Sequence, residues 1–571
     1  MNKIFLFLIL SIFAFQSIAA PKKISEAVEV TFQAVVNGKS RPDGQKTKLL
    51  CSPEASRSWT ENNSKKLLPV IAKETSYIDF AAKNTFQLAR FSDGKVIHTP
   101  LAFSEYPALA ETGETAVILG YNCKKVKTSL RSNSIEIWYT TELGVKGTPA
   151  MAYGIPDGLV LKVVRNGNYE ISATEVKLLK SKETEPVLPA EMGESMDAPL
   201  YKHRITESLI TTVNVFTNEQ ISFGNEITNP TDTESEKTFK YSSGTVILKK
   251  VKLPVVPDDT QLFAELYQHS SGDAYDRTGS VFMIPRDKEQ SFLDGLRNGT
   301  KTMPAFQARN GKSYHGVVAT ESFSPLVEIM RFFTSFGIGQ FNDKVKVYGQ
   351  QWEDSTLYKQ DVTELLPVLQ GECWIGVFIG NYDKGGHRAS LKLKYYPGSM
   401  EVADKPAKKY WTMPLFNTLN VLEMSGQEYG TMFENDSLKV DVTVPEGVKN
   451  VQMRYITTGH GGWGGGDEFN QKQNTILLDG KVLFQFTPWR NDCATFRKYN
   501  PASGNFWNGV TSSDYSRSGW CPGTATNPVF YPVPDLTPGK HQIKVAIPLG
   551  KNEGGSFSSW NVSGILTGEY E

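Results

Sequence analysis

The chain has 571 residues and carries 61 Lys plus Arg against 61 Asp plus Glu, so its formal net charge at pH 7 is zero. A balanced chain has no bulk field that would attract nucleic acid or an anionic membrane, and we expect neither as a partner. Aromatic residues make up 11% of the sequence, with 48 Gly and 30 Pro. Most apolar segments are short and alternating, a pattern typical of an all-β protein.

The first twenty residues predict a secretory signal peptide. Lys3 precedes an apolar run from Ile4 to Phe15, and small residues follow at Ser17, Ala19 and Ala20. A charged start, an apolar core and a small-residue cleavage site in this order are typical of such peptides. The apolar core is too short to cross a bilayer, and no later run approaches the ~20 apolar residues of a transmembrane helix. We expect cleavage near Ala19 or Ala20 and a secreted or periplasmic protein.

Residues 21–198 are predicted to form an additional β-rich N-terminal domain. Segments 135–140, 160–164 and 173–178 have the composition of strands, and a polar, Pro-broken stretch at 181–198 indicates a linker. The stretches Ile118-Leu-Gly-Tyr-Asn-Cys-Lys-Lys, Ile137-Trp-Tyr-Thr and Tyr153-Gly-Ile-Pro-Asp-Gly resemble the GLPGLI-type β domains of secreted proteins. That resemblance implies a curved sheet of the LolA kind.

The rest of the chain alternates strands and turns and is predicted to form two adjacent antiparallel jelly-roll or β-sandwich domains. A Pro- and Lys-containing break at 402–409 divides it into domains of residues 199–404 and 405–571. Ligands favour the groove between two such domains. The predicted strands are 245–251, 261–267, 280–284, 390–395, 438–444, 451–456, 475–478 and 541–547.

Five cysteines are an odd number for an oxidising compartment, so we expect one to be free. Cys373, in an apolar context, is the best candidate for a buried thiol. Cys493 and Cys521 are the best candidates for a disulfide, which on loop length would stabilise the fold by about 3 to 4 kcal/mol. Cys51 with Cys123 is a second predicted pairing.

The first segment with residue types suited to chemistry is Leu266-Tyr-Gln-His-Ser-Ser-Gly-Asp-Ala-Tyr-Asp-Arg. It places two carboxylates, Asp273 and Asp276, on a turn after a strand, with Arg277 adjacent. Surface turns are rich in Asp and Arg, so a solvated turn is the competing interpretation.

A glycine-rich segment follows at residues 456–469. It holds His460, Trp463 and Glu468 among six glycines. Glycine has no Cβ, which lets the backbone approach a ligand closely. A flexible surface loop explains the same composition.

The third segment, Ser516-Arg-Ser-Gly-Trp-Cys-Pro-Gly, combines Arg517 and Trp520 with the expected disulfide partner Cys521. An ordinary ion pair and an ordinary core aromatic are the competing interpretation. Three polar-aromatic loops are nevertheless more than a sandwich needs.

Together these segments resemble the peptide-N-glycosidase F family, in the right order and over roughly residues 205–571. Asp273-Ala-Tyr-Asp-Arg resembles its Trp-Asp-Arg stretch, and Gly459-His-Gly with Asp467-Glu-Phe resembles its Gly-His and acid-bearing segments. The third segment is nearly the family's arginine and Trp-Cys-Pro-Gly element.

The resemblance implies a role for each matched residue. Asp276 falls on the principal catalytic aspartate and Glu468 on a supporting catalytic glutamate. Arg277 and Arg517 fall on arginines at the same cleft. The implied substrate-binding residues are Asp273, Tyr275, Gly380, Tyr382, His460, Trp463 and Trp520.

The chain departs from the family pattern at one loop. Gly380 stands where the family's second supporting glutamate would fall, and Tyr382 replaces a sugar-contacting tryptophan. The disulfides that flank the family's two acids are also absent.

Hydrolysis of a secondary amide needs a nucleophilic water, a proton for the departing nitrogen and stabilisation of the carbonyl oxygen. A carboxylate such as Asp276 can orient or deprotonate the water, while an arginine supplies a fixed positive charge at the oxygen. A second carboxylate close by, for which Glu468 is the candidate, would raise one pKa, so that one acid donates while the other accepts.

We therefore expect a secreted amidase that cuts the bond between asparagine and the innermost N-acetylglucosamine of N-linked glycans and converts Asn to Asp. The expected substrates are N-glycosylated proteins and glycopeptides. We expect no cofactor and no metal, and a monomer.

Three other functions compete with this expectation. The paired jelly roll resembles copper-dependent peptidylglycine monooxygenase, but histidines at positions 98, 203, 269, 315, 387, 460 and 541 include no closely spaced pair. A glycosidase also uses two carboxylates, and would leave a sugar on asparagine. A non-catalytic glycan-binding protein would need the aromatics without the acids. Serine hydrolase chemistry lacks a Gly-x-Ser-x-Gly elbow.

Overall fold

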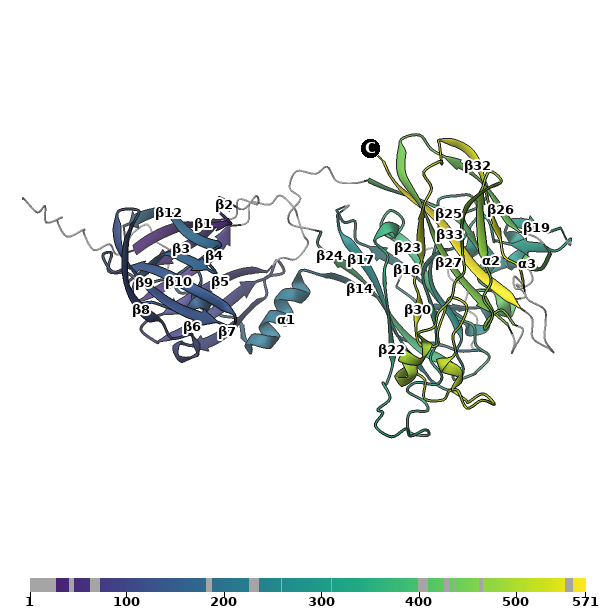
Figure 1. Cartoon of the computed structure of the whole chain (residues 1–571), viewed down its shortest axis with the longest axis horizontal. Coiled ribbons are helices and arrows are strands. Elements are labelled where there is room, and N and C mark those ends of the chain that lie inside the picture. The colour runs from purple at the N-terminus through teal and green to yellow at the C-terminus, as the bar shows by residue number, and fades with distance from the viewer. Residues whose placement is uncertain are drawn as a thin grey trace, which may run out of the picture. The chain divides into compact units, whose positions relative to one another are not determined.

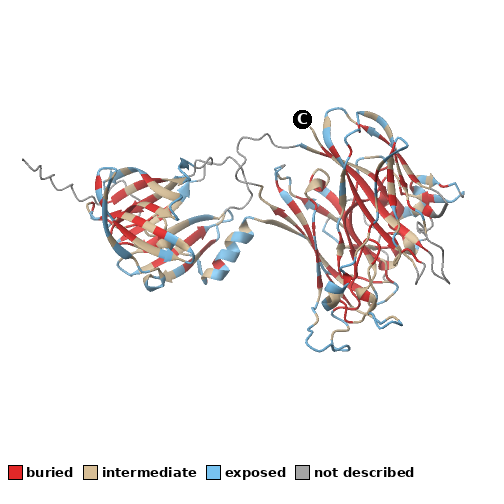
Figure 2. Cartoon of the chain, in the orientation of Figure 1, coloured by how far each residue is buried: buried red, intermediate tan, exposed pale blue. Residues whose placement is uncertain are grey.

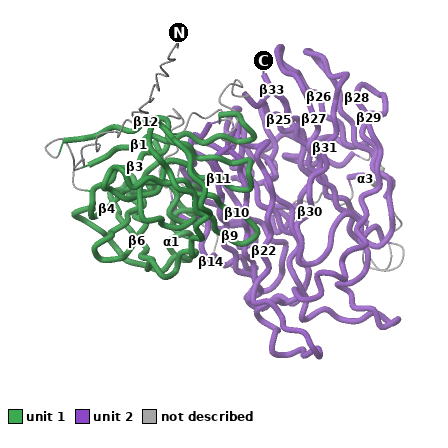
Figure 3. Tube along the Cα trace, turned by 60° about the vertical axis from the view of Figure 1, so that its left-hand side comes forward, with its two compact units in different colours: residues 1–209, 400–403 green, residues 210–399, 404–571 purple. Residues whose placement is uncertain are grey.

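A computed structural model describes residues 27–40, 46–61, 72–180, 187–224, 236–257, 259–309, 311–398, 409–425, 432–435, 437–461, 466–549 and 558–570. The predicted signal peptide lies outside the described residues, as does Trp463. The chain divides into unit 1, residues 1–209 with 400–403, and unit 2, residues 210–399 with 404–571 (Figure 3). None of the helices in the described segments has the length and apolar character needed to cross a membrane.

Unit 1 is built on one sheet and a helix. Thirteen strands of its described part lie in the order β13-β7-β6-β5-β4-β3-β1-β12-β11-β10-β9-β8, with β2 beside β1. Figure 1 shows that this sheet is strongly curved. Alternate residues of β1, Val28, Val30 and Phe32, are buried in one cluster with Leu49 and Leu161, as the period of two in a strand requires. Helix α1 (Ala198–Ser208) begins after Asp197, whose side chain accepts a hydrogen bond from the Leu200 N–H. It extends unit 1 past the predicted domain limit at residue 198.

The strands of unit 1 have the following bounds: β1 (Ala27–Val36), β2 (Lys39–Ser40), β3 (Lys46–Cys51), β4 (Ala55–Glu61), β5 (Lys73–Asp79), β6 (Asn84–Arg90), β7 (Val96–Ala102), β8 (Ala110–Ile118), β9 (Tyr121–Leu130), β10 (Asn133–Thr140), β11 (Leu159–Arg165), β12 (Tyr169–Leu179) and β13 (Glu194–Ser195).

The first half of unit 2 is a sandwich of two antiparallel sheets. One sheet has the order β14-β24-β17-β22, and the other β15-β16-β23-β18-β21-β30. Burial alternates strictly along β24, because one face packs on the core and the other meets solvent. The bounds are β14 (Thr211–Ile221), β15 (Phe239–Tyr241), β16 (Val246–Leu253), β17 (Gln261–Ser270), β18 (Thr278–Ile284), α2 (Phe292–Asn298), β19 (Ala305–Gln307), β20 (Ser313–His315), β21 (Val327–Phe333), β22 (Thr356–Asp361), β23 (Gly371–Ile379) and β24 (His387–Tyr396).

The second half of unit 2 is another two-sheet sandwich, with the orders β25-β33-β27-β31 and β26-β32-β28-β29. Figure 2 shows buried residues gathered along the strands of both sandwiches. The chain is therefore all-β, with two jelly-roll domains after a β-rich N-terminal unit, as predicted. The bounds are β25 (Lys409–Asn417), α3 (Met432–Asn435), β26 (Leu438–Val444), β27 (Val448–His460), β28 (Asn474–Leu478), β29 (Lys481–Phe486), β30 (Ala525–Thr526), β31 (Val529–Pro532), β32 (Gly539–Ala546) and β33 (Ser559–Tyr570).

A buried polar contact joins the two sandwiches. The Arg331 guanidinium of β21 pairs with Glu328 at 2.7 Å and donates to the Asn561 carbonyl of β33 at 2.6 Å. From the other side, Arg454 of β27 donates to the carbonyls of Glu328 and Ile329 at 2.9 and 3.0 Å. Separating the sandwiches would leave the buried guanidinium groups without these partners, which would cost free energy. The network therefore favours this arrangement of the two sandwiches. Strand β30 adds to it by pairing with β21.

The cysteine predictions are confirmed for three of the five residues. Cys493 and Cys521 form a disulfide, and Cys373 is a free buried thiol. The predicted pairing of Cys51 with Cys123 is wrong. Both are free and buried in the apolar cluster of unit 1, where a small thiol packs as a hydrophobic side chain.

Candidate functional site

The acidic turn joins β17 to β18 in the first sandwich, and hydrogen bonds fix its shape. The Asp273 side chain accepts from the Tyr275 N–H at 3.1 Å, and the Thr334 hydroxyl donates to the Tyr275 carbonyl at 3.0 Å. The Arg277 N–H in turn donates to that hydroxyl at 2.7 Å. Asp276 lies between these anchors, so its carboxylate is held in a defined direction.

The glycine-rich segment joins β27 to β28 in the second sandwich and presents Glu468. Its neighbour Asp467 is fully buried and accepts a hydrogen bond from the Trp560 indole at 2.8 Å. The Glu468 carbonyl accepts from the Ser518 N–H at 2.9 Å. The buried neighbour Asp467 and the hydrogen bond from Ser518 therefore anchor the Glu468 backbone.

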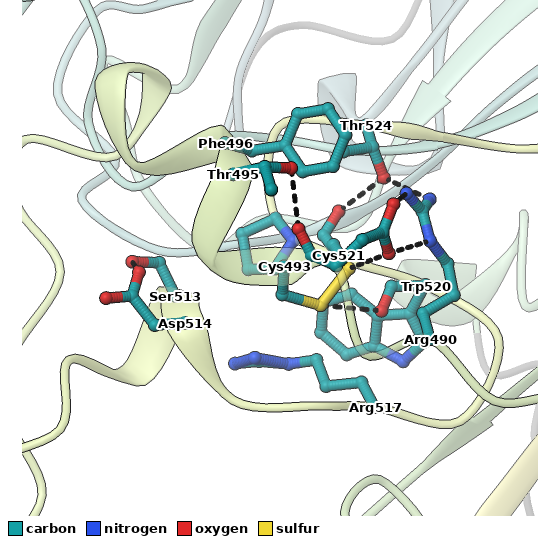
Figure 4. The surroundings of a disulfide bond; sticks show 12 residues. Arg490, Cys493, Thr495, Phe496, Ser513, Asp514, Arg517, Trp520, Cys521 and Thr524 are labelled. Atoms are coloured by element: carbon teal, nitrogen blue, oxygen red, sulfur yellow. Dashed lines mark hydrogen bonds and ion pairs between the residues drawn. A yellow bond between two sulfur atoms is a disulfide. The ribbon is translucent and has the colours of Figure 1, made fainter.

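The third segment places Arg517 next to the disulfide Cys493–Cys521 (Figure 4). Backbone hydrogen bonds of 3.0 and 2.8 Å connect Arg517 with Arg490. The Arg517 guanidinium lies 4.6 Å from the centre of the Trp520 ring and 5.0 Å from that of Phe469. These contacts leave Arg517 1% exposed and its planar group in one orientation.

Arg517 joins the two carboxylates that come from different sandwiches. Its Nη2 donates to Asp276 Oδ2 at 3.2 Å, and its Nε donates to Glu468 Oε1 at 3.0 Å. Its Nη1 donates to the Ser512 carbonyl at 3.0 Å. Asp276 and Glu468 remain partly exposed, with 16% and 21% of their side chains accessible, so both can reach a ligand.

The surroundings raise the pKa of both acids. Burial raises the pKa of Asp276 and of Glu468 above the ordinary carboxyl range, and the Arg517 charge opposes the rise at each. The two carboxyls also interact with each other, since the charge of Asp276 disfavours ionisation of Glu468. Such a pair can hold one proton near neutral pH, which suits one acid for accepting a proton and the other for donating it.

A cavity of about 410 Å³ opens over these acids. Of the residues predicted to form the site, Tyr275, Asp276, Glu468 and Arg517 line it. Sequence reasoning missed its other lining residues, because none of them carries a charge and only Phe469 lies in a recognised segment. They are Phe336, Phe469, Gly504, Asn505, Phe506 and Ser512.

Asp273 and Arg277 form a second ion pair beside the cavity. The Arg277 Nε donates to Asp273 Oδ2 at 2.7 Å, and Asp273 is 2% exposed. His387 Nε2 lies 3.3 Å from the same carboxylate oxygen, and His387 Nδ1 lies 3.0 Å from Gln268 Nε2. Asp273 is therefore buried and held by its ion pair with Arg277. This is a positioning role rather than the predicted substrate contact.

The predicted sugar contact of Trp520 is also replaced by a positioning role. Trp520 is 3% exposed, with Arg517 over its ring and Phe333 stacked on it at 4.1 Å between centres. Its indole donates to the Gly459 carbonyl at 2.9 Å. No broad face of the ring is left for a sugar.

His460 lies behind Trp520 rather than in the cavity. Its Nε2 is 2.9 Å from the Thr458 hydroxyl, and its ring packs 5.6 Å from those of Phe333 and Trp520. Burial, with the charges of Arg331 and Arg517, lowers the pKa of His460 to about 3, so its ring is neutral. A neutral His460 adds no positive charge behind Arg517, and its position supports packing rather than the predicted substrate contact.

The predicted pair Gly380 and Tyr382 lies near Arg277. The Arg277 guanidinium is 5.6 Å from the centre of the Tyr382 ring, which is 56% exposed. Tyr382 donates from its hydroxyl to Glu423 at 2.7 Å. Glu423 comes from the second half of the chain, and no sequence motif identified it.

The seven histidines do not gather into a copper site. In the described part of the chain, the one group with metal-ligand spacing is Asp492 with Cys493 and Cys521. Both sulfurs of that group belong to the disulfide, which removes the thiolates that would bind a metal.

Comparisons with known proteins cover almost the whole chain. The family described as "N-glycanase peptide, N-terminal domain" matches residues 30–203. "Peptide-N-glycosidase F, N terminal" matches residues 212–395, and "Peptide-N-glycosidase F, C terminal" matches residues 428–567. A search of curated proteins found no match.

Two solved structures of PNGF-II are similar to this chain from end to end. One is 43% identical, with 95% of this chain and 98% of that chain covered and a TM-score of 0.80. The other is 44% identical, with 96% and 100% covered and a TM-score of 0.83. On this similarity, the chain belongs to the peptide-N-glycosidase F family.

Proposed function

We propose that this protein hydrolyses the amide bond between an asparagine side chain and the innermost N-acetylglucosamine of N-linked glycans. The single observation that carries the proposal is the Arg517 guanidinium held between Asp276 and Glu468 at 3.2 and 3.0 Å in an open cavity. Family membership supplies the substrate class. The substrates would be N-glycosylated proteins and glycopeptides.

In the proposed mechanism Asp276 is the general base. Its ionised carboxylate accepts a proton from a water molecule, whose oxygen attacks the carbonyl carbon of the asparagine side chain. Arg517 keeps its charge throughout, because the guanidinium does not deprotonate in proteins. It favours the ionised form of Asp276 and the negative charge that develops on the carbonyl oxygen.

Glu468 is the proposed proton donor. Burial and the charge of Asp276 raise the pKa of Glu468. Glu468 can therefore keep its proton under conditions in which Asp276 is ionised. Transfer of that proton to the amide nitrogen lets the carbon–nitrogen bond break. The products are an aspartate side chain and a sugar that carries an amino group at the released carbon.

Mass spectrometry of a short N-glycopeptide after incubation tests the proposal. We expect a peptide in which aspartate replaces the glycosylated asparagine, and the intact glycan in solution. A peptide that retains one sugar would identify a glycosidase instead. An unchanged glycopeptide that binds the protein would identify the non-catalytic glycan-binding alternative, which exposed aromatics such as Tyr275 and Tyr382 also suit.

We further propose that the protein is exported and acts as a monomer without a cofactor. The charged and apolar start of the sequence supports export. Sequencing the N-terminus of the protein recovered outside the cells would test this, with cleavage expected near Ala19 or Ala20.

A further inference from the structure

Glu423 is an acid that neither the sequence motifs nor the proposed mechanism uses, and it lies beside the candidate site. It begins the short 3-10 helix Glu423–Ser425, which follows β25 of the second sandwich. Its carboxylate nevertheless meets Tyr382, which follows β23 of the first sandwich. The contact therefore joins chain segments that follow strands of two different sandwiches.

Buried apolar residues fix the backbone that carries Glu423. Leu419, Val421 and Leu422 are at most 2% exposed and belong to a core cluster of the first sandwich that includes Phe378. The Glu423 N–H also donates to the Asn420 carbonyl at 3.0 Å. This anchor fixes the backbone at Glu423, and the hydrogen bond from Tyr382 holds its carboxylate.

Gly380 leaves the space that the Glu423 carboxylate uses. A Cβ at position 380 would lie 3.7 Å from Glu423 Oε2 and 3.1 Å from the Phe378 ring. A longer side chain there would crowd or displace the carboxylate. The Glu423 carboxylate therefore lies beside Gly380, although it comes 43 positions later in the chain (423 minus 380).

The surface around Glu423 has the features of a sugar-binding platform. Tyr275 and Tyr382 are 62% and 56% exposed, and the Arg277 guanidinium lies 4.9 and 5.6 Å from the centres of their rings. Tyr275 also lines the catalytic cavity, so the platform begins at its rim. Aromatic faces pack on the apolar side of a sugar ring, and a carboxylate accepts hydrogen bonds from its hydroxyl or amide groups.

One oxygen of Glu423 is available for such hydrogen bonds. Tyr382 donates to Oε1, whereas Oε2 has no hydrogen-bond partner among the described residues. Burial and the Glu423 charge raise the pKa of Tyr382 to about 12, so its hydroxyl keeps its proton and continues to donate.

We propose that Glu423 binds the N-acetylglucosamine core of the substrate through Oε2, and so positions the glycan relative to Asp276. This inference rests on the proposed function for the class of ligand. It assigns a substrate-binding residue to a segment outside the three motifs.

Kinetics on one N-glycopeptide separate this role from a structural one. Glu423→Gln should raise KM roughly tenfold, as expected for loss of a charge-assisted hydrogen bond, with kcat nearly unchanged. Tyr382→Phe keeps the ring and Oε2 and should cost less. Glu446→Gln, on the exposed turn between β26 and β27, is the matched control and should have no effect. Equal effects of Glu423→Gln and Tyr382→Phe that do not add in the double variant would show that Glu423 only holds Tyr382, and would overturn the proposal.

A binding measurement keeps the test independent of the reaction. Free diacetylchitobiose should bind the Asp276→Asn variant, and adding Glu423→Gln should weaken that binding roughly tenfold. If the wild type fails to hydrolyse the glycopeptide but this difference is seen, the proposed function fails and the Glu423 site stands. Equal binding by the two variants would overturn the Glu423 site whatever the activity of the wild type.

Discussion

Asp276 and Arg517 are separated by 241 positions in the chain, yet Arg517 Nη2 lies 3.2 Å from Asp276 Oδ2. One residue belongs to a turn of the first sandwich and the other to a disulfide-anchored segment of the second. The proposed base and the charge that controls it therefore meet only where the two sandwiches meet.

Asp276→Asn should nearly abolish activity without unfolding the protein, because the amide keeps the shape of the side chain and removes its basicity. A general base contributes ~10² to 10⁴-fold, so a variant that retained more than about a tenth of the rate would contradict the assignment. Single-turnover rates on a glycopeptide measure the effect, and far-UV circular dichroism checks the fold. Glu468→Gln should cost less.

Arg517→Lys should lower kcat strongly, although it conserves the charge. Lysine cannot reproduce the fork that reaches Asp276 and Glu468 together, or the planar stacking against Trp520 and Phe469. We expect a loss on the order of a hundredfold, comparable to removal of one fixed transition-state donor. Arg131→Lys, on an exposed turn of unit 1, is the control. Equal activity of the two variants would show that a point charge is sufficient.

The pH profile of kcat/KM should be bell-shaped. Burial, opposed by the Arg517 charge, raises the pKa of Asp276 to about 6 and that of Glu468 to about 7. A raised pKa means protonation at higher pH, so the acid limb should lie near pH 6 rather than near the ordinary carboxyl value of about 4. Activity should fall again above about pH 7 as the donor loses its proton. The Glu468→Gln variant should lose this second limb, and an unchanged profile would contradict the assignment of the donor.

Asp273→Asn should destabilise the fold by roughly 1 to 3 kcal/mol at neutral pH, because it weakens a buried acceptor with three partners, Tyr275, Arg277 and His387. Burial acts to raise the pKa of Asp273, but hydrogen bonds from His387 and Arg277 outweigh it and hold the pKa at about 2. The carboxylate therefore stabilises the fold above its unfolded pKa of about 4, and this contribution disappears as the pH falls toward 2. Urea unfolding of variant and wild type should converge over that range. A constant difference would show that the charge of Asp273 is not its source.

Chelators should leave activity unchanged. The position between Asp276 and Glu468, where a cation could neutralise both carboxylates, is taken by the Arg517 guanidinium. Activity should be assayed after incubation with EDTA and dialysis, and again after adding zinc or calcium. Inhibition that either ion reverses would contradict a mechanism based on arginine.

Local sequence patterns predicted the all-β class and several of the strands, whereas the roles of Asp276 and Glu468 were implied only by the resemblance to a family. Alternation along β24 and β26 and the spacing of the acidic and arginine-bearing segments all report on local structure. Hydrophobic periodicity cannot show which ring faces stay free. The resemblance implied that Trp520 contacts sugar, whereas Arg517 and Phe333 cover its ring.

The role of Glu423 could not be predicted for a different reason. Its partner Tyr382 follows a strand of the first sandwich, whereas Glu423 follows a strand of the second, and no fixed spacing in the sequence connects them. Phe506 was missed similarly, since a phenylalanine in a polar loop carries no chemical signal until the fold brings it to the cavity.

Because the two acids come from different sandwiches, the enzyme can be active only while the two sandwiches remain packed against each other. Activity therefore measures this packing. During denaturation, each sandwich can keep its strands after the Arg331 and Arg454 contacts between them have opened. Catalysis would then stop at the opening step, before most of the secondary structure is lost. A polypeptide cut between Tyr396 and Lys409 would for the same reason depend on reassociation of its halves, and its specific activity would rise with protein concentration.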